Sequence, residues 1–310
     1  MAAIETTALE KQYGDVTALG GLDLAVEEGE VFGFLGPNGA GKSTTIDVLL
    51  DFVRPTAGSA TVLGMDAQEQ SQAIRRRTGV LPEGYDVYER LSGKQHVDFV
   101  IDSKDADESA WDVLEEVGID DAADRKAGSY SKGMRQRLLL GMALVGDPDL
   151  LILDEPSTGL DPAGVREIRE LIRGVADDGG TVFFSSHILS QVEAVCDRVG
   201  ILRNGELVAV DTVEGLRDAA EVESTLGVST RGGFDEAALA AVRDLEGVSE
   251  VTVHGNELVA TVADSSKFAV LSTLEAAGVN IVDFQTEEAS LEELFLSYTD
   301  GGPAPAEVDR

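Results

Sequence analysis

The sequence predicts an α/β protein in two parts: a parallel sheet with crossover helices over residues 1–218, and a small α+β unit over residues 219–299. In the first part, short and wholly apolar runs alternate with helical stretches, which is typical of strands buried on both faces of a parallel sheet. These runs end in polar residues, and one ends in a glycine-rich turn. In the second part, the rhythm changes to alternating strands and two short helices.

In the first part, residues 31–35 (VFGFL) predict a buried strand, and a helix is expected to start at Lys42. The apolar runs 150–153 and 181–184 predict two further strands of the same sheet. Residues 92–146 show helical spacing of apolar side chains and predict a helical subdomain, taken as about 84–146.

Asn204-Gly205 separates two apolar runs, 199–202 and 207–210, which predicts a hairpin with a type I′ turn. In the second part, the expected order is β-α-β-β-α-β, with helices over 234–245 and 267–277. That order is the one of a ferredoxin-like unit. A short amphipathic helix is expected from Ser290, and residues 300–310 are expected to form a disordered tail.

The composition predicts a folded intracellular chain. Hydrophobic residues make up 43% of the 310 residues, enough for a sizeable core. A single cysteine excludes an internal disulfide, and three scattered histidines give no zinc-ligand spacing. We expect no signal peptide and no membrane span, because the N-terminus lacks a basic and apolar leader and the apolar runs are far shorter than about 20 residues.

The charge is strongly and evenly acidic. There are 58 acidic and 24 basic residues, a net charge of −34. Residues 221–310 hold 18 acids and 4 bases, a net −14, which leaves −20 for residues 1–220 and argues against a single acidic tail. Self-repulsion of this size is screened at molar salt, so the charge favours an extreme halophile as the source, with an acidic mesophilic protein as the alternative. It also disfavours nucleic acid as a partner.

Residues 36–44 (GPNGAGKST) fit the pattern G-x-x-x-x-G-K-[ST] between the predicted strand and helix. In that context the glycines let backbone N–H groups surround a polyphosphate, and the helix adds its positive end. Lys42 is expected to reach the β- and γ-phosphates, and Ser43 to ligate Mg²⁺. The predicted nucleotide-binding residues of this loop are Gly36, Asn38, Gly39, Gly41, Lys42, Ser43 and Thr44.

Two carboxylates follow the strand at 150–153. Asp154 is expected to hold Mg²⁺, and Glu155 to accept a proton from attacking water; by itself the pair also fits a helix cap. His187 closes the next strand, 32 residues after Glu155 (187 − 155), and is taken as a third catalytic residue beside Glu155 and Lys42.

Residues 129–137 (SYSKGMRQR) resemble the signature motif of the ATP-binding-cassette (ABC) ATPases. The motif's Ser131 lies 89 residues after Lys42 (131 − 42) and 23 before Asp154 (154 − 131), the order and spacing of that family. The resemblance covers residues 1–218. It implies a head-to-tail homodimer in which each ATP lies between the phosphate loop of one subunit and Ser131 and Gly133 of the other. Asp161 would bridge the two sites, and Tyr13 would stack on adenine.

Two departures from the commonest family pattern narrow the resemblance. The signature has Tyr130, Lys132 and Met134 in place of its usual residues, and Glu83 replaces a loop glutamine. Glu83 is expected to offer oxygen to Mg²⁺ and to touch the nucleotide site. Both departures resemble the branch that serves type-2 exporters, including drug exporters and the copper-site maturation system of nitrous oxide reductase.

Residues 289–296 (ASLEELFL) also resemble the C-terminal end of exporter ATPases of that branch. The sequence therefore predicts an ATP- and Mg²⁺-dependent ATPase that drives a separate integral-membrane permease, most simply an exporter, from the cytoplasmic face of the cell membrane. Glu83 and residues 84–146 are expected to touch the permease.

Three features of the sequence allow more than one interpretation: the function of the ATPase, the role of residues 221–299 and the role of an arginine cluster. A soluble ABC ATPase acting on ribosomes or DNA remains an alternative. Residues 221–299 fit either a packing or dimerisation domain, the favoured interpretation, or a ligand-sensing module. Arg75-Arg76-Arg77 is interpreted as a solvated helix end in preference to a phosphate site.

Overall fold

The computed structural model describes residues 1–157, 160–186, 192–219 and 224–287. The chain divides into two compact units, Met1–Val213 and Glu214–Arg310. The domain boundary predicted after residue 218 lies inside helix α8 (Val213–Ala219), a few residues after the division between the two units. The predicted boundary stays a prediction. The expected helix from Ser290 and the tail 300–310 lie outside the described residues.

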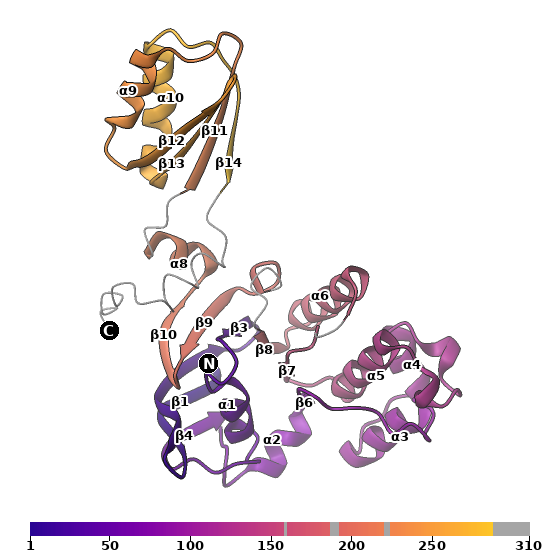
Figure 1. Ribbon diagram of the computed structural model, residues 1–310. Coiled ribbons are helices and arrows are strands. Elements are labelled where there is room, and N and C mark those ends of the chain that lie inside the picture. Colours follow the sequence, from indigo (N-terminus) through magenta and orange to yellow (C-terminus); the bar gives the residue numbers. More distant parts are fainter. Residues whose placement is uncertain (158–159, 187–191, 220–223, 288–310) are drawn as a thin grey trace. The chain divides into compact units, whose positions relative to one another are not determined.

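A six-stranded sheet organises the first unit, in the order β10-β9-β3-β8-β7-β6 (Figure 1). Five strands run parallel, and only β10 pairs antiparallel with β9. The predicted buried strands are confirmed, since every residue of β3 and β7 is buried. The strand bounds are β3 Val31–Leu35, β6 Thr78–Leu81, β7 Leu150–Asp154, β8 Thr181–Ser186, β9 Arg198–Arg203 and β10 Glu206–Asp211.

The predicted hairpin joins β9 and β10. Asn204 and Gly205 have φ values of 51° and 81°, the two positive angles that a type I′ turn requires. The Gly205 N–H donates to the carbonyl of Ala40 at 2.8 Å, so the hairpin turn also supports the loop that follows β3.

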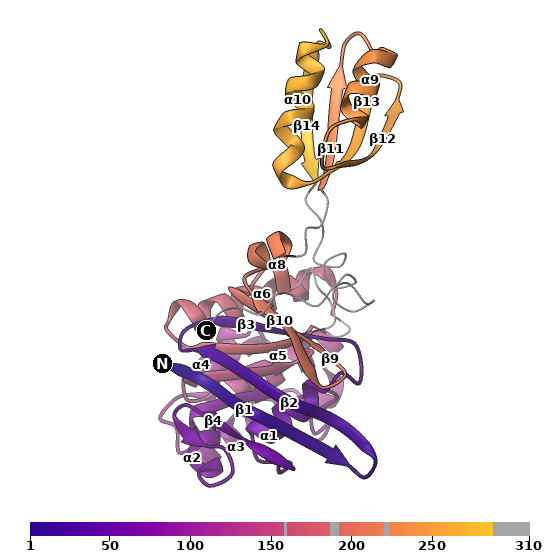
Figure 2. The same cartoon turned by 90° about the vertical axis from the view of Figure 1, so that its left-hand side faces the viewer.

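A second, antiparallel sheet was not predicted. Its order is β2-β1-β4-β5, and Figure 2 shows β1 and β2 running side by side. Register shifts interrupt the β1–β2 ladder, so β1 has no clean period-2 alternation, whereas residues 22–27 of β2 alternate between buried and exposed side chains. The bounds are β1 Ala2–Tyr13, β2 Val16–Glu27, β4 Ala57–Val62 and β5 Met65–Asp66.

Helix α1 (Lys42–Leu49) packs between the two sheets. Its Ile46, Val48 and Leu49 belong to one core with residues of both sheets, including Ile4 and Phe32. Helix α6 (Pro162–Asp177) begins at an Asp161 N-cap and contacts β8 and β3. Helix α2 (Ser71–Arg77) precedes β6. The start of α1 is thus held rigidly at the carboxyl end of β3.

The predicted helical region contains three helices that pack on one another (Figure 1). They are α3 (Gly93–Lys104), α4 (Ala110–Glu116) and α5 (Lys132–Leu144), with short 3₁₀ turns at Asp120–Ala122 and Ala127–Ser129. The segment 82–91 connects β6 to α3. No helix among the described residues is long and apolar enough to cross a bilayer.

The second unit confirms the predicted β-α-β-β-α-β order, with a sheet ordered β12-β13-β11-β14. Helices α9 and α10 lie on one face of this sheet (Figure 1), over a separate core that includes Leu226, Leu258 and Val270. The bounds are β11 Ser224–Thr230, α9 Glu236–Arg243, β12 Val248–His254, β13 Glu257–Val262, α10 Lys267–Ala276 and β14 Ile281–Glu287.

Candidate functional site

The glycine-rich loop between β3 and α1 lies tightly against its neighbours. A Cβ on Gly36 would lie 2.6 Å from the Leu202 carbonyl oxygen, and one on Gly41 would lie 2.7 Å from the Ala18 carbonyl oxygen. Gly41, the N-cap of α1, has φ +115°, which side chains rarely tolerate. Both positions therefore require glycine.

The crest of this loop is open. Asn38 and Gly39 are exposed, and a Cβ on Gly39 would meet nothing within 4 Å. Ser43 is exposed in the first turn of α1, and Thr44 follows it half-buried. An open crest over a helix N-terminus fits a polyphosphate, and the exposed Ser43 hydroxyl could hold the cation that accompanies it.

Lys42 is buried and turned back into the loop. Its Nζ donates to the Gly36 carbonyl at 2.7 Å and lies 3.8 Å from the Glu155 Oε1. Both side chains are under a tenth exposed, at 7% and 5%. The structure thus joins two residues 113 positions apart (155 − 42) that were both predicted to be catalytic.

The two carboxylates at the end of β7 are held by β8. Ser185 donates its hydroxyl to Asp154 Oδ1, and the Glu155 N–H donates to both the carbonyl and the hydroxyl oxygen of Ser185, each at 3.2 Å. Glu155 has φ +52°, an uncommon backbone angle for a residue with a side chain. Sequence analysis missed Ser185, which only the β7–β8 pairing places here.

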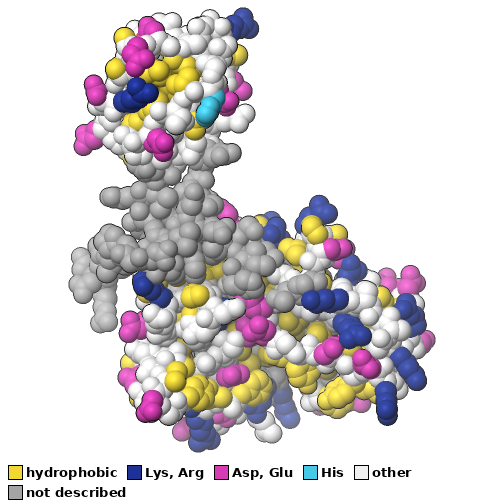
Figure 3. Space-filling view, viewed as in Figure 1, with side chains coloured by type: hydrophobic (Ala, Val, Ile, Leu, Met, Phe, Trp, Pro, Cys, Tyr) yellow, Lys and Arg dark blue, Asp and Glu magenta, His cyan; other side chains and the backbone are white. Residues whose placement is uncertain are grey.

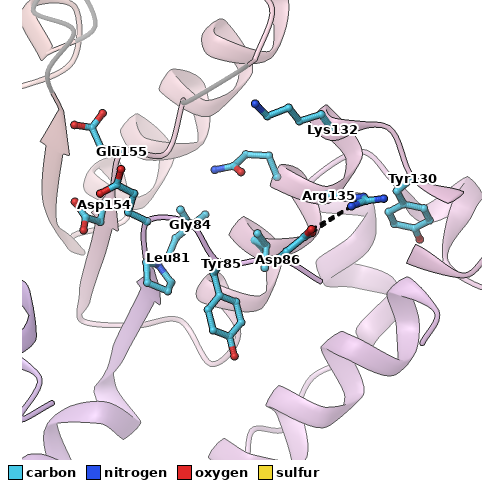
Figure 4. Close-up of a pocket in the computed structure, with 13 residues that line it drawn as sticks. Leu81, Gly84, Tyr85, Asp86, Tyr130, Lys132, Arg135, Asp154 and Glu155 are labelled. Carbon is cyan, nitrogen blue, oxygen red and sulfur yellow. Dashed lines mark hydrogen bonds and ion pairs between the residues drawn. The ribbon is translucent and has the colours of Figure 1, made fainter. Parts of the chain in front are cut away.

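Glu83, Asp154 and Glu155 line one cavity between the segment after β6 and helix α5 (Figure 4). Tyr85, Asp86 and residues of α5 complete its wall. With Asp86, four carboxylates line this cavity, and carboxylate oxygens are ligands that Mg²⁺ prefers. Among the described residues, no three such side chains are placed together as a metal-binding group.

Asp47 is a further carboxylate that sequence analysis missed. It lies on α1, one turn after Ser43. Partial burial, and then the charge of Asp154, raise the pKa of the Asp47 carboxyl above its ordinary value of 3.8.

Ser131 and Gly133 of the signature lie with Asp161 at a second cavity. Ser131 is the N-cap of α5 and accepts from the Met134 N–H at 3.2 Å; Asp161 caps α6 in the same way, accepting from the Gly164 N–H at 2.8 Å. Ser131, Gly133 and Asp161 line this second cavity and do not line the first. The predicted site residues thus fall into two groups on one chain.

Two contacts join α5 to the loops around the carboxylates. The Gln136 amide donates to the Pro156 carbonyl at 2.5 Å, and Arg135 pairs with Asp86 at 3.2 Å (Figure 4). No sequence signal indicated Asp86, because its partner is 49 residues away.

Tyr13 takes no part in these contacts. Tyr13 is 47% exposed at the end of β1, with Lys11 Nζ 4.8 Å from its ring centroid. His187 lies outside the described residues.

The arginine cluster has structural partners. Arg75 donates to the Leu50 carbonyl at 2.8 Å, at the end of α1, and Arg77 pairs with Asp149 at 2.8 Å. Arg76 is exposed. Two of the three arginines thus tie α2 to its neighbours, in agreement with the helix-end interpretation.

Two family models match this chain, each over a different part of it. Residues 19–158 match the family model "ABC transporter", and residues 212–299 match "ATP-binding protein DrrA1-3-like, C-terminal domain".

Curated relatives are similar over nearly the whole chain. The linearmycin resistance ATP-binding protein LnrL of Bacillus subtilis is 34% identical over 96% of this chain and 98% of its own. The daunorubicin/doxorubicin resistance ATP-binding protein DrrA of Streptomyces peucetius is 35% identical, over 97% and 93%.

A solved ATP-binding subunit of an ABC transporter superposes with a TM-score of 0.65 at 28% identity, over 70% of this chain and 92% of that one. Fold, motif order and full-length similarity agree. The chain therefore belongs to the ATP-binding subunits of ABC transporters, and its first unit is an ABC ATPase cassette.

Proposed function

We propose that this protein is the ATP-hydrolysing subunit of an exporter and drives a separate permease that removes antibiotic-like small molecules. The observation that carries the proposal is the buried approach of Lys42 Nζ to Glu155 Oε1, 3.8 Å apart at the phosphate loop. The substrate class is carried over from the relatives, whose names record linearmycin and daunorubicin/doxorubicin resistance.

In this proposal, Glu155 orients and deprotonates the water that attacks the γ-phosphate in line. Lys42 exchanges its bond to the Gly36 carbonyl for the phosphate oxygens, and His187 holds the γ-phosphate. The nearby Ser185 accepts from the Glu155 N–H and so restrains the backbone from which the carboxylate extends. Mg²⁺, when bound, neutralises phosphate charge, and Ser43, Asp154 and Glu83 are the residues that would hold it.

The active unit in this proposal is a head-to-tail homodimer. Its support is the separation of the site residues into two cavities, because Ser131, Gly133 and Asp161 line a cavity that none of the carboxylates Glu83, Asp154 and Glu155 lines. Residues 125–137 contain five Lys or Arg and no Asp or Glu, against a net charge of −34 for the chain. Figure 3 shows Lys and Arg side chains over the helical part of the cassette. A cationic signature segment suits the ATP of the partner subunit, with Tyr13 stacking on adenine.

The permease contact is assigned to the segment 82–91 and α3. Tyr85, Tyr88 and Phe99 are 57%, 66% and 68% exposed. Large aromatic side chains exposed on neighbouring elements are typical of a protein–protein interface. The protein would then act at the cytoplasmic face of the membrane.

The test is Glu155→Gln, which keeps the side-chain shape and removes the base. We expect ATP hydrolysis at least about 100-fold slower, with ATP still bound and an ATP-dependent dimer accumulating. ATPase turnover, nucleotide affinity and size-exclusion chromatography measure these three quantities. Glu115→Gln, at an exposed position of α4, is the matched control. Near-normal turnover of purified Glu155→Gln would remove Glu155 from this role.

A further inference from the structure

Tyr130 is buried although it directly precedes the exposed Ser131 of the signature. Its side chain is 5% exposed, and its hydroxyl donates to the Ala122 carbonyl at 2.7 Å. The Arg125 guanidinium lies 5.8 Å from the ring centroid. Burial raises the pKa of the Tyr130 hydroxyl, so this group stays protonated and remains a donor.

Gly93, the first residue of α3, leaves room for that hydroxyl. A Cβ on Gly93 would lie 2.3 Å from the Tyr130 Oη, whereas the next atoms, Tyr130 Cζ and the Ala123 carbonyl oxygen, would lie at 3.3 and 3.5 Å. Gly93 does not have a positive φ. The tyrosine hydroxyl, and not the backbone, therefore excludes a side chain at this position.

Backbone hydrogen bonds join the segment that carries Gly93 to the segment that leads to Tyr130. The Lys94 N–H donates to the Ala123 carbonyl at 2.9 Å, and the Ala127 N–H donates to the Leu91 carbonyl at 2.8 Å. The segment that leads into the signature is thus bonded to the end of segment 82–91. Tyr130 lies where these two segments meet, one residue before Ser131.

We propose that Tyr130 and Gly93 form a positioning pair that places the signature Ser131 against the nucleotide of the partner subunit and links it to the permease-facing segment 82–91. Tyr130 is a positioning residue, because its hydroxyl is committed to Ala122. This inference rests on the proposed function, in which Ser131 completes the partner's ATP site. A displaced signature would impair dimer closure and turnover, while the phosphate loop of the same chain would still bind ATP.

The experiment uses the full-length chain and three variants: Gly93→Ala, Tyr130→Phe and the double variant. Gly93→Ala forces the tyrosine hydroxyl away, and we expect turnover to fall about 10–100-fold, since small misplacements at reacting groups have effects of this size. Tyr130→Phe removes one buried hydrogen bond, and we expect a fall of about 3–10-fold. In the double variant the clash with the hydroxyl is gone, so turnover should return to that of Tyr130→Phe.

Two further measurements separate positioning from general damage. The affinity of the monomer for ATP should stay within about twofold in all variants, and ATP-dependent dimerisation in the Glu155→Gln background should weaken in parallel with turnover. Gly174→Ala in α6, where a Cβ meets nothing within 4 Å, is the matched control and should change neither.

The inference is overturned if folded Gly93→Ala turns over normally, or if Tyr130→Phe fails to rescue it. If Gly93→Ala does not fold, dimerisation of Tyr130→Phe in the Glu155→Gln background decides: weakening supports the pair, and wild-type behaviour refutes it. An inactive wild-type ATPase would instead count against the proposed function, so the two failures are distinct.

Discussion

At the scale of a single residue, Glu155 combines an unfavourable backbone angle with hydrogen bonds that stabilise it. Its φ of +52° costs roughly 1–3 kcal/mol for a residue with a side chain. The two hydrogen bonds from its N–H to Ser185 offset part of that cost and hold the backbone in place. Such strain persists where the surroundings over-determine a conformation, which fits the role proposed for the Glu155 carboxylate.

Removing the charge of Asp47 should raise the stability of the protein but weaken its response to Mg²⁺. Its raised pKa means that the folded state binds the Asp47 proton more tightly than the unfolded state does. Stability is therefore lost as the pH rises from 3.8 through the folded pKa, and it stays lower above that window. Asp47→Asn removes this loss, so the nucleotide-free protein should melt higher at pH 7, with the difference vanishing as the pH falls through the window.

The same change should weaken the response to Mg²⁺, because it removes a negative charge one turn from Ser43. We expect the Mg²⁺ concentration for half-maximal ATPase activity to rise about 2–5-fold. Asp112→Asn on α4 is the control for loss of one charge. An unchanged melting temperature of Asp47→Asn at pH 7 would show that the Asp47 carboxylate does not destabilise the folded state.

At the scale of elements, α3 has a complete capping box. Ser92 accepts from the Gln95 N–H at 3.2 Å, and the Gln95 side chain accepts from the Ser92 N–H at 2.9 Å. The cap matters beyond the helix, since α3 begins at Gly93 beside Tyr130.

Ser92→Ala should lower the free energy of unfolding by about 1 kcal/mol, within the usual range for a lost N-cap. Chemical denaturation measures the change, with Ser103→Ala near the end of α3 as control. Equal effects of the two substitutions would show that the capping box adds no specific stability.

Elements with a local signal were predicted well. The strand 31–35, the Asn204-Gly205 turn and the ferredoxin-like order all follow from apolar runs or turn residues that lie within a few positions. The sheet of β1, β2, β4 and β5 was missed. Its β1–β2 hairpin turns at Gly14-Asp15, a local signal that went unused, whereas β4 pairs with β1 over a long separation (62 − 4 = 58 for Ile4 and Val62). The expectation of a parallel α/β core was therefore incomplete, because it left out this antiparallel sheet.

At the scale of the whole molecule, each unit has its own hydrophobic core. Every predicted nucleotide-binding residue lies before residue 188. Deleting residues 221–310 should therefore leave ATP affinity within about twofold of the full-length value, as expected when separate sites do not share partners. Isothermal titration with a non-hydrolysable ATP analogue checks this. Loss of affinity in a folded truncation would show that the proposed domain boundary is wrong.

The net charge of −34 leads to a prediction about salt. In dilute buffer the long-range field opposes both ATP entry and the proposed pairing of two like-charged subunits. The Debye length falls from about 10 Å at 0.1 M to about 3 Å at 1 M. We expect the melting temperature and the turnover at saturating Mg-ATP to rise between about 0.1 M and above 1 M KCl. A flat or falling profile in both would refute a halophilic origin and leave the ATPase assignment intact.

The sequence by itself determined the cassette, its motifs and their order. Phosphate loops, apolar strands and turns are local patterns, so a few adjacent residues are enough to identify each of them. Only the tertiary structure decided which distant residues meet: Ser185 with Asp154, Arg135 with Asp86, and Tyr130 with Gly93. Each of these pairs joins segments more than 30 positions apart (185 − 154 = 31 for the nearest). Such contacts arise from strand pairing and helix packing, and no short-range pattern in the chain records them.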